Sequence, residues 1–187
     1  MNDINLDLSK RYTVKDYLSW NFDVRLELID GVVKLMSGVR LLHSDITQGL
    51  TRVLSSFKER KKIYRSFHAP FDVFFSDVDV VQPDFGIVCD LSICKNDGIH
   101  GTPDFLVEVL SSTLTSKRQD LYEKFQLYQK YGVREYWIID PDDKSLIVYL
   151  LQSDGKYNAG VLYEYKEDST IKLSVVDLEI GLSDIFD

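Results

Sequence analysis

Apolar residues recur at helical spacing in two long segments of the chain. One face of the first segment consists of Leu42, Ile46, Leu50, Val53, Leu54 and Phe57. This spacing predicts a long amphipathic helix. The second segment predicts a helix from about Ser116 to Tyr131, followed by Gly132, which suits the left-handed turn after a helix. Thr13 and Asp16 have the spacing of a capping box and predict a short helix near the N-terminus.

Runs of apolar and β-branched residues predict the strands. Residues 25–29 and 32–36 are joined by Asp30 and Gly31, a pair typical of a tight β-hairpin turn. Further runs lie at 71–75, 78–81, 85–89, 105–110, 135–139, 146–151, 161–165 and 171–175. Turn-forming residues between the last two runs predict a second hairpin.

Together these elements predict a single α+β domain over residues 1–187, with helices flanking a mixed or mostly antiparallel sheet. Its core is expected over about 12–150, with additional C-terminal antiparallel strands over about 151–187. No linker, repeat or low-complexity tract divides the chain.

Composition agrees with a globular domain and indicates a compartment. The 187 residues are 44% hydrophobic and 28% charged, which is enough apolar material for one core. No run reaches the roughly 20 apolar residues of a membrane span, and the polar N-terminus lacks the apolar centre of a signal peptide. Two cysteines, Cys89 and Cys94, are too few for a disulfide framework or a closed zinc site. A reduced, cytoplasmic compartment is therefore expected.

The net charge of -8, from 22 basic and 30 acidic residues, argues against a protein that coats nucleic acid, because phosphate binding depends on clustered Lys and Arg. The acidic excess is uneven, however. Residues 142–187 hold 10 acidic and 4 basic residues, whereas residues 1–141 hold 20 and 18. The basic run at 58–65 is typical of a solvated helix end, with contact to a DNA backbone as the alternative. Local contact between nucleic acid and the first part of the chain is compatible with this distribution.

Three acidic residues interrupt apolar runs, where an unpaired charge is costly. Glu27 and Glu108 each lie inside a predicted strand, and Asp84 directly precedes one. Taken singly, each is more simply interpreted as a structural carboxylate that caps a turn or pairs with an arginine.

Lys124 adds a cation near the apolar face of the second long helix. At 100° per residue it lies about 60° from Leu121, on the flank of that face. An ammonium there must reach solvent or find carboxylates. Because the helix follows the Glu108 strand through a short loop at 111–115, Asp84, Glu108 and Lys124 are expected to converge. Convergence alone supports equally a catalytic site and a buried ion-pair cluster that only holds the helix to the sheet.

The catalytic interpretation has a specific chemistry. Mg²⁺ prefers one or two carboxylates together with water and phosphate oxygens. It polarises a phosphate and lowers the pKa of a bound water. A neighbouring lysine can orient that water and offset negative charge in the transition state. Two acids and a lysine in an apolar setting therefore indicate a metal-dependent phosphodiesterase.

Short motifs follow one another along roughly residues 12–150. They are LELIDG at 26–31, His43, APFDV at 69–73, VQPD at 81–84, GTPDFLVEVLS at 101–111, DLYEK at 120–124 and YGVREYWIIDP at 131–141. In this order they resemble the Uma2-like family of restriction-endonuclease-fold nucleases, a branch of the PD-(D/E)XK superfamily.

The resemblance implies an α+β restriction-endonuclease-like fold in which Asp84 and Glu108 bind the metal, Mg²⁺ or Mn²⁺. Glu27 would be an additional acid from the N-terminal part of the core. The usual lysine of the superfamily, two residues after the second acid, is absent, because Leu110 occupies that position. Lys124 on the following helix is the candidate in its place, and the helical-face argument selects the same residue.

Two further polar residues have open roles. His43, at the start of the first long helix, can approach a phosphate or support the metal site, but a capping or surface role is the simpler interpretation. Gln82 either supports the metal site or is an ordinary polar residue of a strand, and the sequence does not separate these roles.

The sequence is thus interpreted as a metal-dependent endonuclease that cleaves phosphodiester bonds in nucleic acid, with DNA as the expected substrate and no membrane association. Asp84 and Glu108 are the metal ligands, Glu27 is an auxiliary ligand or water-positioning acid, and Lys124 orients the water. A homodimer would suit the cutting of two strands. The alternatives are a non-catalytic nucleic-acid- or protein-binding module that retains the nuclease fold, and a hydrolase of small phosphodiesters. The intact set of acids and lysine argues against the module.

Overall fold

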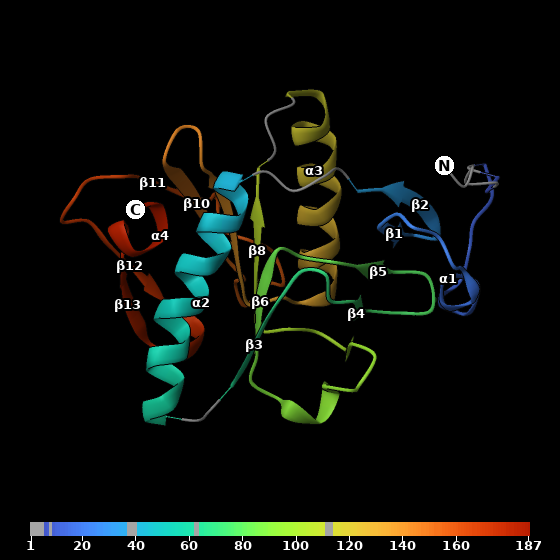
Figure 1. Ribbon diagram of the computed structural model, residues 1–187, viewed down its shortest axis with the longest axis horizontal. Helices are drawn as coiled ribbons and strands as arrows, with labels where there is room; N and C mark the ends of the chain where they lie inside the picture. The colour runs from blue at the N-terminus through green and yellow to red at the C-terminus, as the bar shows by residue number, and fades with distance from the viewer. Residues whose placement is uncertain (1–5, 8, 37–40, 62–63, 111–113) are drawn as a thin grey trace.

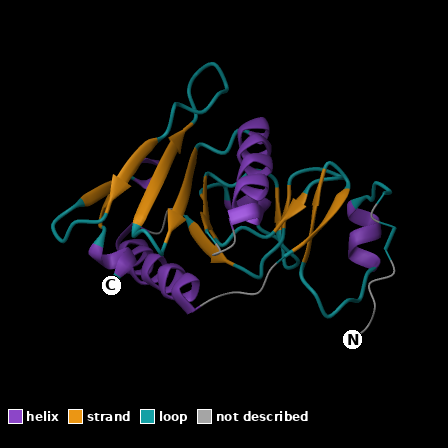
Figure 2. Cartoon of the chain, turned by 90° about the horizontal axis from the view of Figure 1, so that it is seen from above, coloured by secondary structure: helices purple, strands orange, loops and turns teal. Residues whose placement is uncertain are grey.

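Two long helices lie on opposite faces of a six-stranded sheet in the computed structural model (Figure 2). The structure describes residues 6–7, 9–36, 41–61, 64–110 and 114–187, without the side chains of 58–61 and 114–120. Helix α2 (Leu41–Lys61) packs Ile46, Leu50 and Leu54 against one face of the sheet. Helix α3 (Leu114–Tyr131) packs Leu127 and Tyr128 against the other. Both predicted long helices are confirmed.

The six-stranded sheet is mixed. Its strands lie in the order β11 (Val161–Glu164), β10 (Ser145–Leu150), β9 (Glu135–Asp140), β8 (Phe105–Val109), β6 (Phe85–Val88) and β3 (Arg65–His68). Strands β8 and β9 run parallel because α3 connects them across one face, and the other neighbours are antiparallel. Along β8, Phe105, Val107 and Val109 face α2, whereas Leu106 and Glu108 lie on the α3 side.

A second sheet carries the N-terminal hairpin. Its order is β2 (Val32–Leu35), β1 (Leu26–Ile29), β5 (Val80–Val81), β4 (Val73–Phe74) and β7 (Ile99–His100). The predicted hairpin is confirmed: Asp30 and Gly31 have φ of 51° and 73°, the left-handed pair that a two-residue turn requires. Helix α1 (Val14–Ser19) begins at the predicted capping box of Thr13 and Asp16.

The C-terminal strands depart from the prediction. The expected hairpin between 161–165 and 171–175 is wrong, because β11 pairs with β10 while β12 (Thr170–Leu173) pairs with β13 (Leu178–Gly181). The chain reverses through a 3₁₀ turn, η2 (Ser174–Val176), and then Asp177 at φ 54°. The buried carboxylate of Glu135 accepts the backbone N–H groups of Ser174 and Val175 there. A contact with a distant strand therefore places the turn.

The remaining elements complete the α+β architecture, and this predicted class is confirmed. Helix α4 (Ser183–Phe186) packs on α2, and the 3₁₀ turn η1 (Leu91–Ile93) precedes β7. Side chains from β12, β13 and α4 share the core under α2. Helices α1 and α4 lie at opposite ends of the molecule (Figure 1). Among the described residues, no helix is both long and apolar enough to cross a membrane.

Candidate active site

Four ionisable side chains from four elements meet between the two sheets. Glu27 comes from β1, Asp84 directly precedes β6, Glu108 lies in β8 and Lys124 lies in α3. Each is at most 8% exposed. The expected convergence of Asp84, Glu108 and Lys124 is confirmed, and Glu27 joins them. We call this group the acid–lysine cluster.

The Lys124 ammonium lies between two carboxylates. Its Nζ is 2.9 Å from Glu27 Oε1 and 3.0 Å from Glu108 Oε1. An ammonium has three N–H groups, and the described residues occupy two of them. The third would suit a water or a phosphate oxygen. Burial alone would lower the pKa of Lys124, but the facing carboxylates of Glu108, Glu27 and Asp84 outweigh burial and raise it, which favours the protonated ammonium.

Glu108 is also held by a residue that the sequence analysis did not single out. The hydroxyl of Tyr128 donates to Glu108 Oε1 at 2.6 Å. Tyr128 lies four positions after Lys124, so both side chains project from the same side of α3. This i,i+4 relation to the lysine was the available signal for its polar role.

Asp84 is fixed by a strand and a helix. Its Oδ2 accepts the backbone N–H of Val109 at 2.7 Å, which places it beside the Glu108 strand. Its Oδ1 lies 2.9 Å from Nε2 of His43. The capping or surface role favoured for His43 is therefore wrong: the side chain is only 14% exposed and points inward from the first turn of α2.

Gln82 contacts the cluster through its backbone. Its N–H donates to Glu27 Oε1 at 2.8 Å. The side-chain amide points elsewhere: Oε1 accepts Arg25 Nε at 2.7 Å and Nε2 donates to Asp72 Oδ1 at 2.8 Å. Gln82 is thus more than an ordinary polar residue of a strand. Its backbone N–H positions Glu27, and its side chain connects Arg25 to Asp72.

The electrostatics of the cluster favour an additional cation. Burial raises the pKa of Glu108 to about 8; Lys124 opposes this rise, whereas Asp84 and Glu27 add to it. Three carboxyl groups share one ammonium, so the ionised cluster carries an excess of negative charge in a buried setting.

The donor set fits Mg²⁺ or Mn²⁺ held in part by water and substrate. Among the described residues, no three His, Cys, Asp or Glu side chains are arranged to hold a metal ion by themselves. Asp84 and Glu108 would supply two carboxylates, the number that Mg²⁺ sites commonly use together with water and phosphate oxygens. The excess of carboxyl groups over the one ammonium in the cluster is the structural observation that agrees with a divalent ion.

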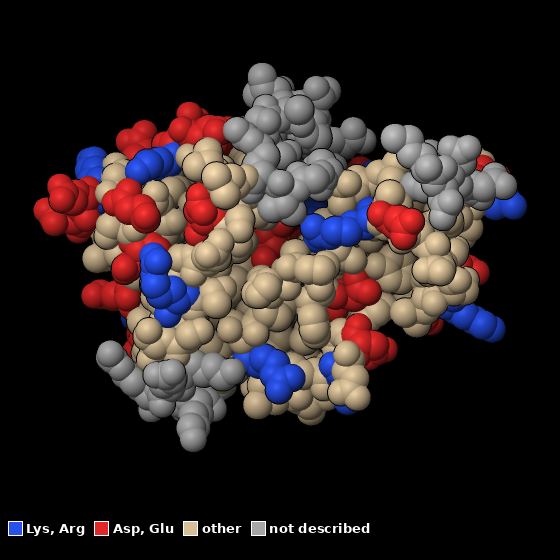
Figure 3. Space-filling view, viewed as in Figure 1, with Lys and Arg blue, Asp and Glu red and all other residues tan. Residues whose placement is uncertain are grey.

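Charged side chains of both signs are spread over the visible surface. Lys and Arg are scattered, with one basic group between α3 and the β1–β2 hairpin, and several Asp and Glu side chains lie at the end that carries β10 and β11 (Figure 3). In the basic run at 58–65, the side chains of 58–63 lie outside the described residues, so its alternative role as a DNA contact stays a prediction.

Comparisons with known proteins identify the family and the fold of the chain. The family model described as "Uma2: Putative restriction endonuclease" matches residues 14–183. A solved structure described as a "putative nuclease belonging to DUF820" from Anabaena variabilis ATCC 29413 superposes with a TM-score of 0.75 at 21% sequence identity. The match covers 93% of this chain and 97% of the other and shows a shared fold. No curated protein matches the sequence.

Proposed function

Because the chain belongs to the Uma2 family, we propose that the acid–lysine cluster is the active site of a divalent-metal-dependent endonuclease that hydrolyses phosphodiester bonds in DNA. The observation that carries the proposal is the position of Lys124 Nζ between Glu27 and Glu108, with Asp84 tied to the next backbone N–H of the same strand. A cluster that only held α3 to the sheet would not need a third carboxylate beside an ion pair that is already satisfied.

Asp84 and Glu108 are the residues that would hold the metal, which supplies Lewis acidity to polarise the scissile phosphate and to acidify the attacking water. His43 orients Asp84 by contacting the oxygen that Val109 leaves free. Tyr128 fixes Glu108 by donating its hydroxyl to Oε1, the oxygen that Lys124 also contacts. The supporting contacts thus leave each acid in one orientation before substrate binds.

Lys124 directs its third N–H toward the attacking water or a phosphate oxygen. Because the ammonium stays protonated, it orients the water and offsets the charge that develops on the phosphate instead of removing a proton. Glu27 holds Lys124 in place, and Gln82 in turn holds Glu27. We therefore assign Glu27 as a positioning acid and not as a metal ligand.

A cleavage assay on supercoiled plasmid across Mg²⁺, Mn²⁺ and chelator tests the proposal. We expect metal-dependent nicking by the wild type and by Lys172→Met, a change at an exposed lysine. Asp84→Asn and Glu108→Gln, which keep the size of the side chains, should abolish nicking while their thermal melts show a folded protein.

The same assay separates the alternatives. Oligonucleotide binding without cleavage under any metal condition would indicate a non-catalytic module. Hydrolysis of a small chromogenic diester in the absence of plasmid nicking would indicate a small-molecule hydrolase. Sedimentation of the nicking-competent protein tests the proposed homodimer.

A further inference from the structure

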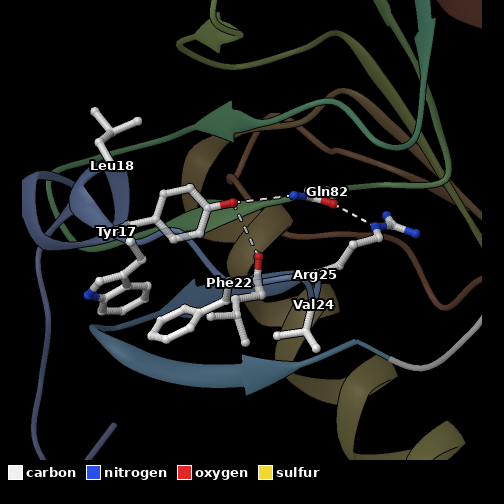
Figure 4. A pocket seen from close by; sticks show the side chains of 8 residues that line it. Tyr17, Leu18, Phe22, Val24, Arg25 and Gln82 are labelled. Atoms are coloured by element: carbon white, nitrogen blue, oxygen red, sulfur yellow. Dashed lines mark hydrogen bonds between the residues drawn. The ribbon is translucent and has the colours of Figure 1, made fainter. Parts of the chain in front are cut away.

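A second pocket lies on the other side of Gln82 from the acid–lysine cluster. It has a volume of about 280 Å³ and is formed by α1, the segment that leads into β1, and residue 82 (Figure 4). Tyr17, Trp20 and Phe22 line it together with Arg25, Gln82 and three aliphatic side chains. We call it the aromatic pocket. Apart from Gln82, none of its residues has a role in the proposed cleavage chemistry.

The aromatic walls are not stacked on one another. The ring centroids of Tyr17 and Trp20 are 5.9 Å apart with planes inclined at 62°, and those of Trp20 and Phe22 are 6.1 Å apart at 49°. A planar group that enters the pocket can therefore lie against a ring face without breaking an existing stack.

The polar end of the pocket is formed by Gln82 and Arg25. Arg25 Nε donates to Gln82 Oε1, and Gln82 Nε2 donates to the hydroxyl of Tyr17 at 3.2 Å (Figure 4). The terminal nitrogens of Arg25 point away from the Tyr17 ring in this view. The pocket therefore offers an entering group aromatic surface beside polar atoms that already have hydrogen-bond partners.

The neighbouring carboxylates decide which planar group fits. Asp72 Oδ1 accepts both Gln82 Nε2 and the Tyr17 hydroxyl, and Glu27 lies beyond the Gln82 backbone. These two acids would repel a phosphate in the pocket. A neutral planar ring fits the aromatic walls without that repulsion.

We propose that the aromatic pocket binds one unstacked nucleobase of the nucleic-acid substrate, from a single-stranded segment next to the phosphate that is cleaved. The proposal rests on the proposed nuclease function, because Gln82 joins the pocket to Glu27 and so places the bound base beside the acid–lysine cluster. A base inside a duplex cannot present its faces to aromatic side chains, whereas single-stranded or extruded bases can. The pocket therefore directs the enzyme to DNA with an unpaired segment.

Binding in the presence of chelator tests this inference without any cleavage. Short labelled single-stranded DNA is compared by fluorescence anisotropy with an oligonucleotide of the same length and charge that carries abasic sites. We expect the base-containing strand to bind about tenfold more tightly than the abasic one, since stacking on aromatic residues contributes this order of affinity. Equal affinities would overturn the inference.

Two variants locate the effect. Phe22→Leu removes an aromatic wall, and Val24→Phe fills the pocket mouth from a residue that is 43% exposed and so leaves the fold intact. Both should reduce the ratio of the affinities for base-containing and abasic strands to near one, whereas Lys172→Met should keep the wild-type ratio. An unchanged preference in Val24→Phe would overturn the inference even if Phe22→Leu fails to fold.

Intrinsic fluorescence gives an independent readout. The chain has two tryptophans: Trp20 lines the pocket, and Trp137 is fully buried against Phe105 on the α2 side of the sheet. The base-containing strand should quench the wild type and leave Trp20→Phe unchanged. Quenching that persists in Trp20→Phe would contradict binding at this pocket.

These experiments distinguish failure of the base-binding proposal from failure of the nuclease proposal. Asp84→Asn should keep the preference for bases and lose nicking. A base preference without cleavage by the wild type would refute the nuclease function and leave a base-binding pocket. Cleavage by a wild type that binds abasic and base-containing strands equally would refute the pocket. A dimer that Val24→Phe dissociates, without any base preference, would identify the pocket as a contact between two copies of the chain and overturn the inference.

Discussion

Lys124 Nζ lies 3.0 Å from Glu108 Oε1, and this contact joins α3 to strand β8 of the six-stranded sheet. The same ammonium lies 2.9 Å from Glu27, which belongs to the five-stranded sheet. The acid–lysine cluster therefore spans the junction of the two sheets. Its geometry depends on their relative placement, so it has consequences for stability as well as for catalysis.

Replacement of the buried cation should destabilise the fold. Lys124→Met leaves Glu27 and Glu108 facing each other without a counter-charge, and breaking a buried pair in this way typically costs about 3 kcal/mol. Urea unfolding should show this loss relative to the wild type, whereas Lys172→Met, an exposed control, should leave the unfolding free energy close to the wild-type value. Equal stabilities for the two variants would mean that Lys124 is not paired as described.

The two glutamates should differ in metal binding. Glu108→Gln removes a proposed ligand and is expected to abolish the heat of Mn²⁺ binding in a calorimetric titration. Glu27→Gln is expected to bind Mn²⁺ with nearly wild-type affinity but to nick DNA about 10²-fold more slowly, because Lys124 loses its charged partner. If Glu27→Gln loses Mn²⁺ binding to the same extent as Glu108→Gln, Glu27 is a ligand and its assignment as a positioning acid fails.

His43 should act through Asp84. Removal of the contact between His43 Nε2 and Asp84 Oδ1 in His43→Ala is expected to weaken Mn²⁺ binding about tenfold, as loss of a group that orients a ligand commonly does. Calorimetry measures this change, and His68→Ala, at an exposed residue outside the cluster, serves as the control. If His43→Ala binds Mn²⁺ with the wild-type affinity, Asp84 does not depend on His43 for its orientation.

Asp79 provides a pH-dependent contribution to stability away from the site. Burial would raise its pKa, but hydrogen bonds from the Tyr131 hydroxyl, the Asp30 backbone N–H and Lys130 outweigh burial and lower the pKa from 3.8. A lowered folded-state pKa means that the ionised form stabilises the protein fully above the unfolded value of 3.8 and that this stabilisation is lost as the pH falls through the folded value.

Asp79→Asn should therefore be less stable than the wild type at neutral pH, and the difference should shrink as the pH falls below 3.8. Urea unfolding across this range measures it, with Asp154→Asn in an exposed turn as the matched control. A difference that is constant with pH would contradict the account of Asp79.

Much of the site could be predicted because charges inside apolar runs are costly. Glu27, Asp84 and Glu108 stand out for that reason, and the helical period identified Lys124. The sequence could not show that Lys124 also reaches Glu27, because that contact depends on how two separate sheets meet. The position of His43 likewise follows from α2 packing across β6 and β8, which no local pattern encodes.

Turn-forming residues predicted the structure correctly where the conformation depends only on the residues of the turn. Asp30 and Gly31 formed the expected hairpin because the left-handed conformation of both residues is a local property. The C-terminal pairing was mispredicted because the buried carboxylate of Glu135, from a strand some 40 residues earlier, binds the turn after β12. The strands β3, β7 and β13 were missed because each has only two to four residues, which is too short for a clear alternating pattern.

The initial rate of plasmid nicking by the wild type and by Asp84→Asn, measured side by side at saturating Mn²⁺, tests the central claim most directly. Asp84→Asn keeps the acceptor for the Val109 N–H and so should remain folded. The account predicts that the wild type nicks at least about 10²-fold faster than the variant. Equal rates, or no nicking by a folded wild type that has bound Mn²⁺, would contradict the assignment of the acid–lysine cluster as a nuclease site.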